Sequence, residues 1–306
     1  MATNVIDGSA EAPAREALDA FRTDLTMSRE KWSLYMDEPG FVATLTKVLA
    51  GPGPAAIDAL RRHAVILMKP EAWIEQRFAD VSRFLDRNGF EIVQSFPCQI
   101  SPLMAREIWR YQWNIAPVER VEVSELILSL GPSYGFFLRD ARPECDTPAS
   151  VRLARLKGPA KPERQKPGHL RYELRAPNRI VSLVHIPDEP ADVIRDLSIM
   201  LGRREVVELL SAVAYDPLPV LSVDPAKLVV SRVEDVASMT PMLDRFDDLS
   251  QRTELIERAV RDYRAPEGHY RIPRSLWRHL LDLCGDIAQL PTLGTKRVQP
   301  LADIAQ

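Results

Sequence analysis

The stretch from Lys166 to Asp196 contains residue types that suit the handling of a phosphoryl group. His185 stands at the end of a hydrophobic run, and Asp196 follows it eleven residues later. A neutral imidazole is a competent nucleophile toward the terminal phosphorus of a nucleotide. A carboxylate on its second ring nitrogen would fix the tautomer and stabilise the charge that forms on attack. The alternative is a hydrogen-bonded structural histidine and a solvated aspartate next to Arg195, and it stays open at this point.

Three cations stand where phosphate oxygens could be held. Lys69 comes directly after an apolar run, where a buried strand would end in the mouth of a sheet. Arg171 offers a fork-shaped guanidinium that can take two phosphate oxygens at once. Lys166 belongs to the basic loop between Gly158 and Gly168, and we expect it to contact a nucleotide as well. The competing interpretations are a surface lysine and a solvated basic loop.

Two tryptophans are candidates for stacking a nucleotide base. Trp109 and Trp113 are four residues apart on a predicted helix, with Tyr111 between them. Aromatic faces can hold a base, although an aromatic helix face belongs more often to the core. We therefore include both tryptophans among the expected nucleotide contacts and keep the core interpretation beside them.

Other common sites are not supported by the sequence. The remaining histidines have no partners at metal-ligand spacing; they are His63, His169, His269 and His279. We therefore predict no metal site built by protein side chains. The motifs of P-loop, Rossmann, zincin and serine-hydrolase sites are also missing from the sequence.

The composition is that of an ordinary globular protein. A chain of 306 residues, 45% hydrophobic and 27% charged, can bury one large core or two smaller ones. The net charge of −3 provides no general attraction to nucleic acid or to an anionic membrane. Three distant cysteines favour a reducing compartment, and the polar start does not resemble a signal peptide. No apolar run approaches the ~18 residues of a membrane span. We expect a cytoplasmic protein without nucleic-acid or membrane partners.

Strands and helices alternate in the middle of the chain. The expected strands are 64–68, 90–96, 125–130, 134–138 and 180–185. The expected helices carry Ile74–Leu85, follow the cap Ser101, lead to Leu156, and follow a cap at Asp188. This order predicts an α+β fold, a ferredoxin-like βαββαβ sandwich whose antiparallel four-stranded sheet has helices over one face.

Helical patterns flank this region on both sides. Ser28 is expected to cap a helix in the first part of the chain, and the run Gly51–Pro54 predicts a linker. We predict a helical N-terminal extension at 1–60, an α+β domain at 61–202 and a mostly helical C-terminal region at 203–306.

Five motifs in the central region resemble those of the nucleoside diphosphate kinase family. Between about Arg61 and Leu201 the chain contains A-V-I-L-M-K-P, R-F-L-D-R-N-G-F-E-I-V, L-K-G-P, K-P-G-H-L-R and V-H-I-P-D. The intervals from Lys166 to Arg171 and from His185 to Asp196 fit the spacing of the family. The resemblance covers roughly half of the chain and implies the fold of that family for 61–202.

A ping-pong mechanism is what the resemblance implies. A nucleoside triphosphate, with Mg²⁺ bridging its phosphates, would phosphorylate His185, and the phosphohistidine would pass the group to a small-molecule acceptor. Lys69 and Arg171 would stabilise charge on the transferring oxygens. Asp196, in place of the family's glutamate, would hold the imidazole. A homo-oligomer is implied as well, with contacts altered by the added helices.

Some nucleotide contacts depart from the family's pattern. Trp109 replaces a tyrosine, and Ser182 replaces an asparagine. Ala154 stands where an arginine is expected, and Ala160 replaces a threonine. We still expect Ser182 and Arg155, which is adjacent to Ala154, to contact the nucleotide. We therefore expect a divergent phosphotransferase with a nucleotide or specialised acceptor. The alternatives are a nucleotide-binding regulatory or interaction module without transfer, and a nucleotidyl-transfer enzyme on the same fold.

Overall fold

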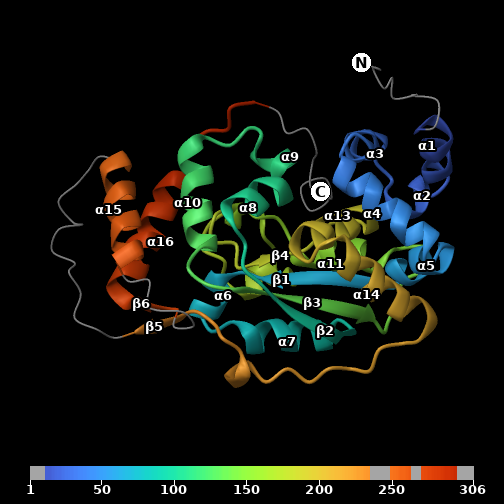
Figure 1. Cartoon of the computed structure of the whole chain (residues 1–306). Helices are drawn as coiled ribbons and strands as arrows, with labels where there is room; N and C mark the ends of the chain where they lie inside the picture. Colours follow the sequence, from blue (N-terminus) through green and yellow to red (C-terminus); the bar gives the residue numbers. More distant parts are fainter. Residues whose placement is uncertain (1–10, 235–248, 263–269, 295–306) are drawn as a thin grey trace, which may run out of the picture.

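The structure is a computed structural model that describes residues 11–234, 249–262 and 270–294 (Figure 1). His269, one of the histidines without expected metal partners, lies outside these residues. Within them, no helix combines the length and the apolar character that a membrane span requires.

A four-stranded antiparallel sheet forms the centre of the fold (Figure 1). Its strands are β1 (His63–Met68), β2 (Phe90–Cys98), β3 (Ser133–Asp140) and β4 (Val184–His185). They lie in the order β2-β3-β1-β4, with every neighbouring pair antiparallel. All residues of β1 are buried, because the strand is covered on both faces. This order confirms the predicted ferredoxin-like α+β sandwich.

Helices connect the strands in the order that was predicted. Two helices join β1 to β2: α6 (Pro70–Ile74) and α7 (Phe78–Arg87). Three join β2 to β3: α8 (Pro102–Ile108), α9 (Arg110–Trp113) and α10 (Val118–Leu128). The path to β4 contains α11 (Ala149–Lys157), a 3-10 turn (Pro162–Arg164) and α12 (Leu170–Glu173), and α13 (Pro190–Met200) follows β4. Ser101 caps α8 as predicted, since its side chain accepts a hydrogen bond from the backbone of Met104 at 3.2 Å.

Two strand predictions need correction. Residues 125–130, expected as a strand, fall mostly in α10, whose residues Arg120, Val123 and Ile127 are buried at helical spacing. A short apolar run does not distinguish a strand from a buried helix, and here packing against the C-terminal helices selects the helix. The strand expected at 180–185 is reduced to Val184–His185, because the chain bends before Val184.

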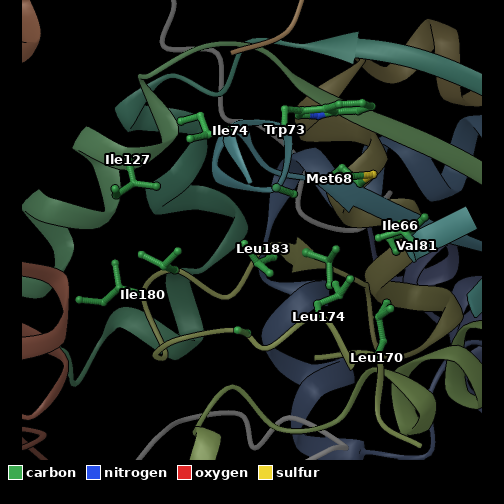
Figure 2. Close-up of a cluster of buried hydrophobic side chains, with 14 of the residues drawn as sticks. Ile66, Met68, Trp73, Ile74, Val81, Ile127, Leu170, Leu174, Ile180 and Leu183 are labelled. Atoms are coloured by element: carbon green, nitrogen blue, oxygen red, sulfur yellow. The ribbon is translucent and has the colours of Figure 1, made fainter. Parts of the chain in front are cut away.

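Helices cover both faces of the sheet, so the expectation of one covered face is wrong. Ala64, Ile66 and Met68 belong to one buried cluster, part of which is drawn in Figure 2, together with α6, α7, α10 and the C-terminal helices. Val65 and Leu67 belong to a second cluster with the N-terminal helices, α8, α13 and α14 (Arg203–Tyr215). Successive side chains of a strand point to opposite faces, so the alternation of β1 divides the core in two.

The N-terminal extension packs against the sheet domain. Its helices are α1 (Glu11–Asp19), α2 (Arg22–Leu25), α3 (Arg29–Met36), α4 (Pro39–Ala50) and α5 (Pro54–Arg61). Ser28 caps α3 as predicted. The expected linker is a tight turn between α4 and α5, a helix that was not predicted, and Gly53 has a φ of 66° there. The boundaries at residues 60 and 202 stay predictions, since side chains from both flanking segments share the second cluster with the sheet.

A buried ionic cluster joins the extension to the start of α13. The Lys31 ammonium lies 2.5 Å from Glu189 and 2.8 Å from Asp192, and Thr26 donates to Glu189 at 2.7 Å. Glu189, and not the predicted Asp188, is the N-cap of α13 and forms a capping box with Asp192. The predicted cap is thus wrong by one residue, because Glu189, which is paired with Lys31 of α3, takes the capping position.

The C-terminal region lies on both sides of the sheet, since α14 packs with the N-terminal helices and the later helices belong to the first cluster. It contains α14 (Arg203–Tyr215), a 3-10 turn (Pro225–Lys227), α15 (Leu249–Asp262) and α16 (Arg274–Ala288). Two short strands that were not predicted, β5 (Arg232–Glu234) and β6 (Arg271–Pro273), pair in parallel. α16 packs on α10, and its Trp277 donates to Glu75 at 2.6 Å.

His63 is expected to make the fold less stable in acid. It is buried at the start of β1, with Nδ1 2.7 Å from the carbonyl of Ala59 and its ring stacked on Phe137. Burial, with a smaller effect of Arg62 and Arg139, lowers the pKa of His63 in the folded protein. Below about pH 6.5 the unfolded chain therefore binds more protons, and the free energy of unfolding falls. Urea unfolding at pH 7.5 and 5.0 should show a smaller loss for His63→Gln than for the wild type. An equal loss would contradict this assignment.

Candidate functional site

A cavity of about 210 Å³ opens between β4, α9, α10, α13 and the loop after α11. Seven of the nine predicted site residues line it: Lys69, Trp109, Trp113, Arg171, Ser182, His185 and Asp196. Arg155 and Lys166 are exposed and do not line it. The tertiary structure thus brings together residues that are more than a hundred positions apart in the chain.

His185 is held by the predicted carboxylate. Its Nε2 lies 2.8 Å from Oδ2 of Asp196, and the two side chains are 15% and 5% exposed. An ionised carboxylate only accepts hydrogen bonds, so Nε2 carries the proton and Nδ1 keeps its lone pair. β4 places His185 opposite Leu67, and α13 packs beside β1 and presents Asp196 to the ring. This imidazole has the tautomer that a nucleophile needs.

A strained turn precedes His185. The backbone N–H of Val184 donates to the carbonyl of Ser182 at 2.7 Å, and Leu183 between them has a φ of 66°. Such a γ-turn is costly for a branched residue and persists only where the surroundings determine it. Here Leu183 is buried in the cluster shown in Figure 2, and its carbonyl accepts from the backbone of Lys69 at 3.0 Å. The turn therefore fixes where β4 begins and where His185 points.

Lys69 lines the cavity, but its ammonium group already has three partners. It donates to the carbonyl of Ile180 at 3.2 Å and to Ser182 Oγ at 3.1 Å, and it lies 2.6 Å from Glu71. The Glu71 carboxylate is completely buried. In this arrangement Lys69 neutralises Glu71 and holds the loop before His185, and Ser182 serves as one of its acceptors.

Arg171 and Lys157 form the wall near Gly158. Arg171 donates to the carbonyls of Gly158 at 2.9 Å and Val184 at 3.0 Å. Gly158 has a φ of 77°, and a Cβ there would lie 2.6 Å from His169, so the turn requires glycine. Lys157 was not predicted as a site residue, although it belongs to the L-K-G-P motif. It is buried and donates to Asp188 at 2.8 Å, and burial, opposed by Asp188, lowers its pKa.

Aromatic rings form the opposite wall. The ring of Trp109 meets that of His185 edge to face, with centroids 5.2 Å apart, and stacks on Trp113 at 5.4 Å. Both tryptophans are half-buried, so they belong to the cavity wall and partly to the core. Trp109 shields the imidazole from solvent on that side.

The N-terminal extension also reaches the site, which sequence reasoning missed. Tyr35 lines the cavity and donates a hydrogen bond to Asp192, one helical turn before Asp196 on α13. Arg195 donates to Glu38 at 2.8 Å. No periodic signal in the sequence pairs α3 with α13, because the contacts join residues about 157 positions apart.

The described residues contain no group of three or more His, Cys, Asp or Glu side chains that could hold a metal ion. The carboxylates in the cavity wall are each bound to protein groups: Asp188 to Lys157, Asp192 to Lys31 and Asp196 to His185. These side chains do not form the ligand set of a resident cation.

No protein-family model matches the sequence, and no curated protein is similar to it. The chain is similar to the solved nucleoside diphosphate kinase of Aquifex aeolicus at 22% identity, over 45% of this chain and 93% of that one, with a TM-score of 0.36. For the enzyme of Encephalitozoon cuniculi the identity is 14%, over 46% and 89%, with a TM-score of 0.37. The halophilic enzyme of Halobacterium salinarum in complex with CDP is 16% identical, over 41% of this chain and 76% of that one, with a TM-score of 0.34. This is a distant resemblance of fold, so the chemistry has to be judged from the geometry of the site.

Proposed function

We propose that the protein is a divergent phosphotransferase that moves the terminal phosphoryl group of a nucleoside triphosphate through a phosphohistidine at His185. The second acceptor is a nucleotide or a specialised small molecule. The observation that supports this most strongly is the 2.8 Å hydrogen bond between His185 and Asp196 in the wall of a cavity that is also lined by lysine and arginine. A structural histidine would not need to stand in the wall of such a cavity.

In the first half-reaction, Nδ1 of His185 attacks the terminal phosphorus. The N–P bond forms, the bond from phosphorus to the bridging oxygen breaks, and the nucleoside diphosphate leaves. Asp196 stabilises the imidazolium that results, because it accepts the Nε2 proton in a buried pair. In the second half-reaction an acceptor oxygen attacks the same phosphorus, the N–P bond breaks, and the histidine returns to its neutral form.

Cations around the cavity would stabilise the transferring oxygens. Arg171 and Lys157 line the wall beside β4, and Lys69 would have to exchange one of its protein contacts for a phosphate oxygen. Phosphoryl transfer places charge on equatorial oxygens, so positioned cations carry most of the catalytic task. We expect Mg²⁺ to arrive on the nucleotide phosphates, since the described side chains do not form a metal site.

The second candidate is a nucleotide-binding module without transfer. It is favoured by Lys69, whose three protein contacts leave no donor for a phosphate unless the loop rearranges. The exposed position of Arg155 and Lys166 favours it too. In such a module the same cavity would bind nucleotide and communicate its presence through the helices added at both ends.

Incubation with ATP labelled at the γ-phosphate tests the proposal. We expect acid-labile, base-stable label on the wild-type chain and none on His185→Ala, because the nucleophile is then missing. The released product should be ADP, whereas AMP and pyrophosphate would indicate nucleotidyl transfer. If no nucleoside triphosphate labels the wild type, the phosphotransferase proposal fails. Nucleotide affinity that is unchanged in His185→Ala, without turnover in either chain, would then support the binding module.

A further inference from the structure

Apart from Lys161 in the loop after α11, the lysines and arginines around the cavity fall into two groups. Lys69, Lys157 and Arg171 are held near β4 by carbonyls or carboxylates of the protein. Arg120 and Arg179 also line the cavity, and Arg120 belongs to α10, which lies beside α16 and apart from α13 (Figure 1). Ile180, next to Arg179, lies on the same side of the core as Ile127 of α10 (Figure 2). This second group is not used by the proposed transfer step.

Arg120 and Arg179 have no carboxylate partner among the described residues. Within the part of the chain that the structure describes, neither guanidinium forms an ion pair, although Arg120 is only 7% exposed. The guanidinium of Arg120 donates to the carbonyl of Leu290 at the end of α16, while its Nε is buried with no acceptor among the described residues. Arg179 is half-buried. No acidic side chain in the described ranges therefore balances their charges.

The two guanidinium charges of Arg120 and Arg179 repel each other, and a bound anion would relieve that repulsion. Burial, together with the nearby Arg179, lowers the pKa of Arg120 to about 10. Both groups are nevertheless charged at neutral pH, and charges that leave water require a partner. A guanidinium pair binds planar or tetrahedral oxyanions in a bidentate manner, so phosphate or carboxylate is the partner that fits.

We infer that Arg120 and Arg179 form an anion subsite that binds a second phosphate or carboxylate group of the ligand. The inference rests on the proposed function only in placing the reactive phosphorus at His185. The ligand then carries anionic groups at two ends, with a middle part beside Trp109 and Trp113. A nucleotide whose only anionic groups are the phosphates at His185 would leave the two arginines unpaired.

Calorimetric titration of the full chain with His185→Ala measures the subsite without any transfer. Inorganic phosphate and citrate are the two probes, and the tighter one identifies a phosphate-bearing or a carboxylate-bearing ligand. Addition of Arg179→Gln should weaken the tighter probe at least tenfold. Arg204→Gln, on the exposed face of α14, is the matched control for the loss of one positive charge and should leave the affinity unchanged.

A loss smaller than tenfold in Arg179→Gln, or no binding of either probe, would overturn the inference. Arg120→Lys keeps the charge but removes the fork, and it should also weaken binding if its melting temperature stays near that of the parent. If Arg120→Lys does not fold, the half-buried Arg179 decides the question alone. Failure of the ATP-labelling experiment would not affect these titrations, so the two proposals fail separately.

Discussion

Asp196→Asn is expected to slow phosphorylation of His185 by about 10²- to 10⁴-fold, the range of effects seen when acid-base groups are removed. In the wild type the carboxylate accepts from Nε2 at 2.8 Å, which leaves Nδ1 free to attack. An asparagine can turn its amide N–H₂ toward Nε2, and the imidazole then carries its proton on Nδ1. Substitution of a carboxylate by its amide keeps the shape of the site and presents the wrong tautomer. Rapid-quench labelling with γ-labelled ATP measures the rate.

Two controls separate the tautomer from a general loss of structure. The melting temperature of Asp196→Asn should stay close to that of the wild type, since the amide can keep a hydrogen bond to the ring. Asp196→Glu retains a carboxylate and should recover part of the rate. A wild-type rate in Asp196→Asn would show that the hydrogen bond does not govern the reactivity of His185.

Lys31→Met should lower the free energy of unfolding by about 3–5 kcal/mol, as is usual when one partner of a buried pair is removed. Lys31 is 4% exposed and lies between two carboxylates, Glu189 at 5% and Asp192 at 12%. Without the ammonium group, both charges stay buried at the start of α13 and repel each other. Urea unfolding at pH 7 gives the midpoint and the slope that this comparison needs.

The matched control is Arg204→Met, which removes a similar cation from an exposed pair with Glu208 and should leave the urea midpoint unchanged. Adding Asp192→Asn to Lys31→Met should restore part of the stability, because one of the uncompensated charges disappears. If Lys31→Met unfolds at the wild-type urea concentration, the cluster does not hold the extension on α13. Since α13 carries Asp196, a true loss should also slow labelling of His185.

Much of the central sheet could be predicted because its signals are local. The run of β1 is apolar at every position after His63, and Ser101 caps α8 with a side-chain hydrogen bond that spans three residues. The pairing of His185 with Asp196 also depends on short-range geometry, because His185 ends β4 and Asp196 lies on α13, the next helix of the chain. The failures lie where packing decides between local alternatives, as in 125–130, which became part of α10 against α16.

The sequence by itself determined the residue types of the site: an imidazole, a carboxylate eleven residues later and cations at strand and turn positions. It also determined the order of the four sheet strands, because side-chain periodicity is set by the backbone. Only the tertiary structure decided which charges are already paired. Asp192 is bound to Lys31 and Arg195 to Glu38, while Arg120 and Arg179 have no carboxylate partner among the residues that the structure describes. These ion pairs join residues that are far apart in the chain. A local sequence pattern does not predict them, because it gives no information about the distance between such residues in space.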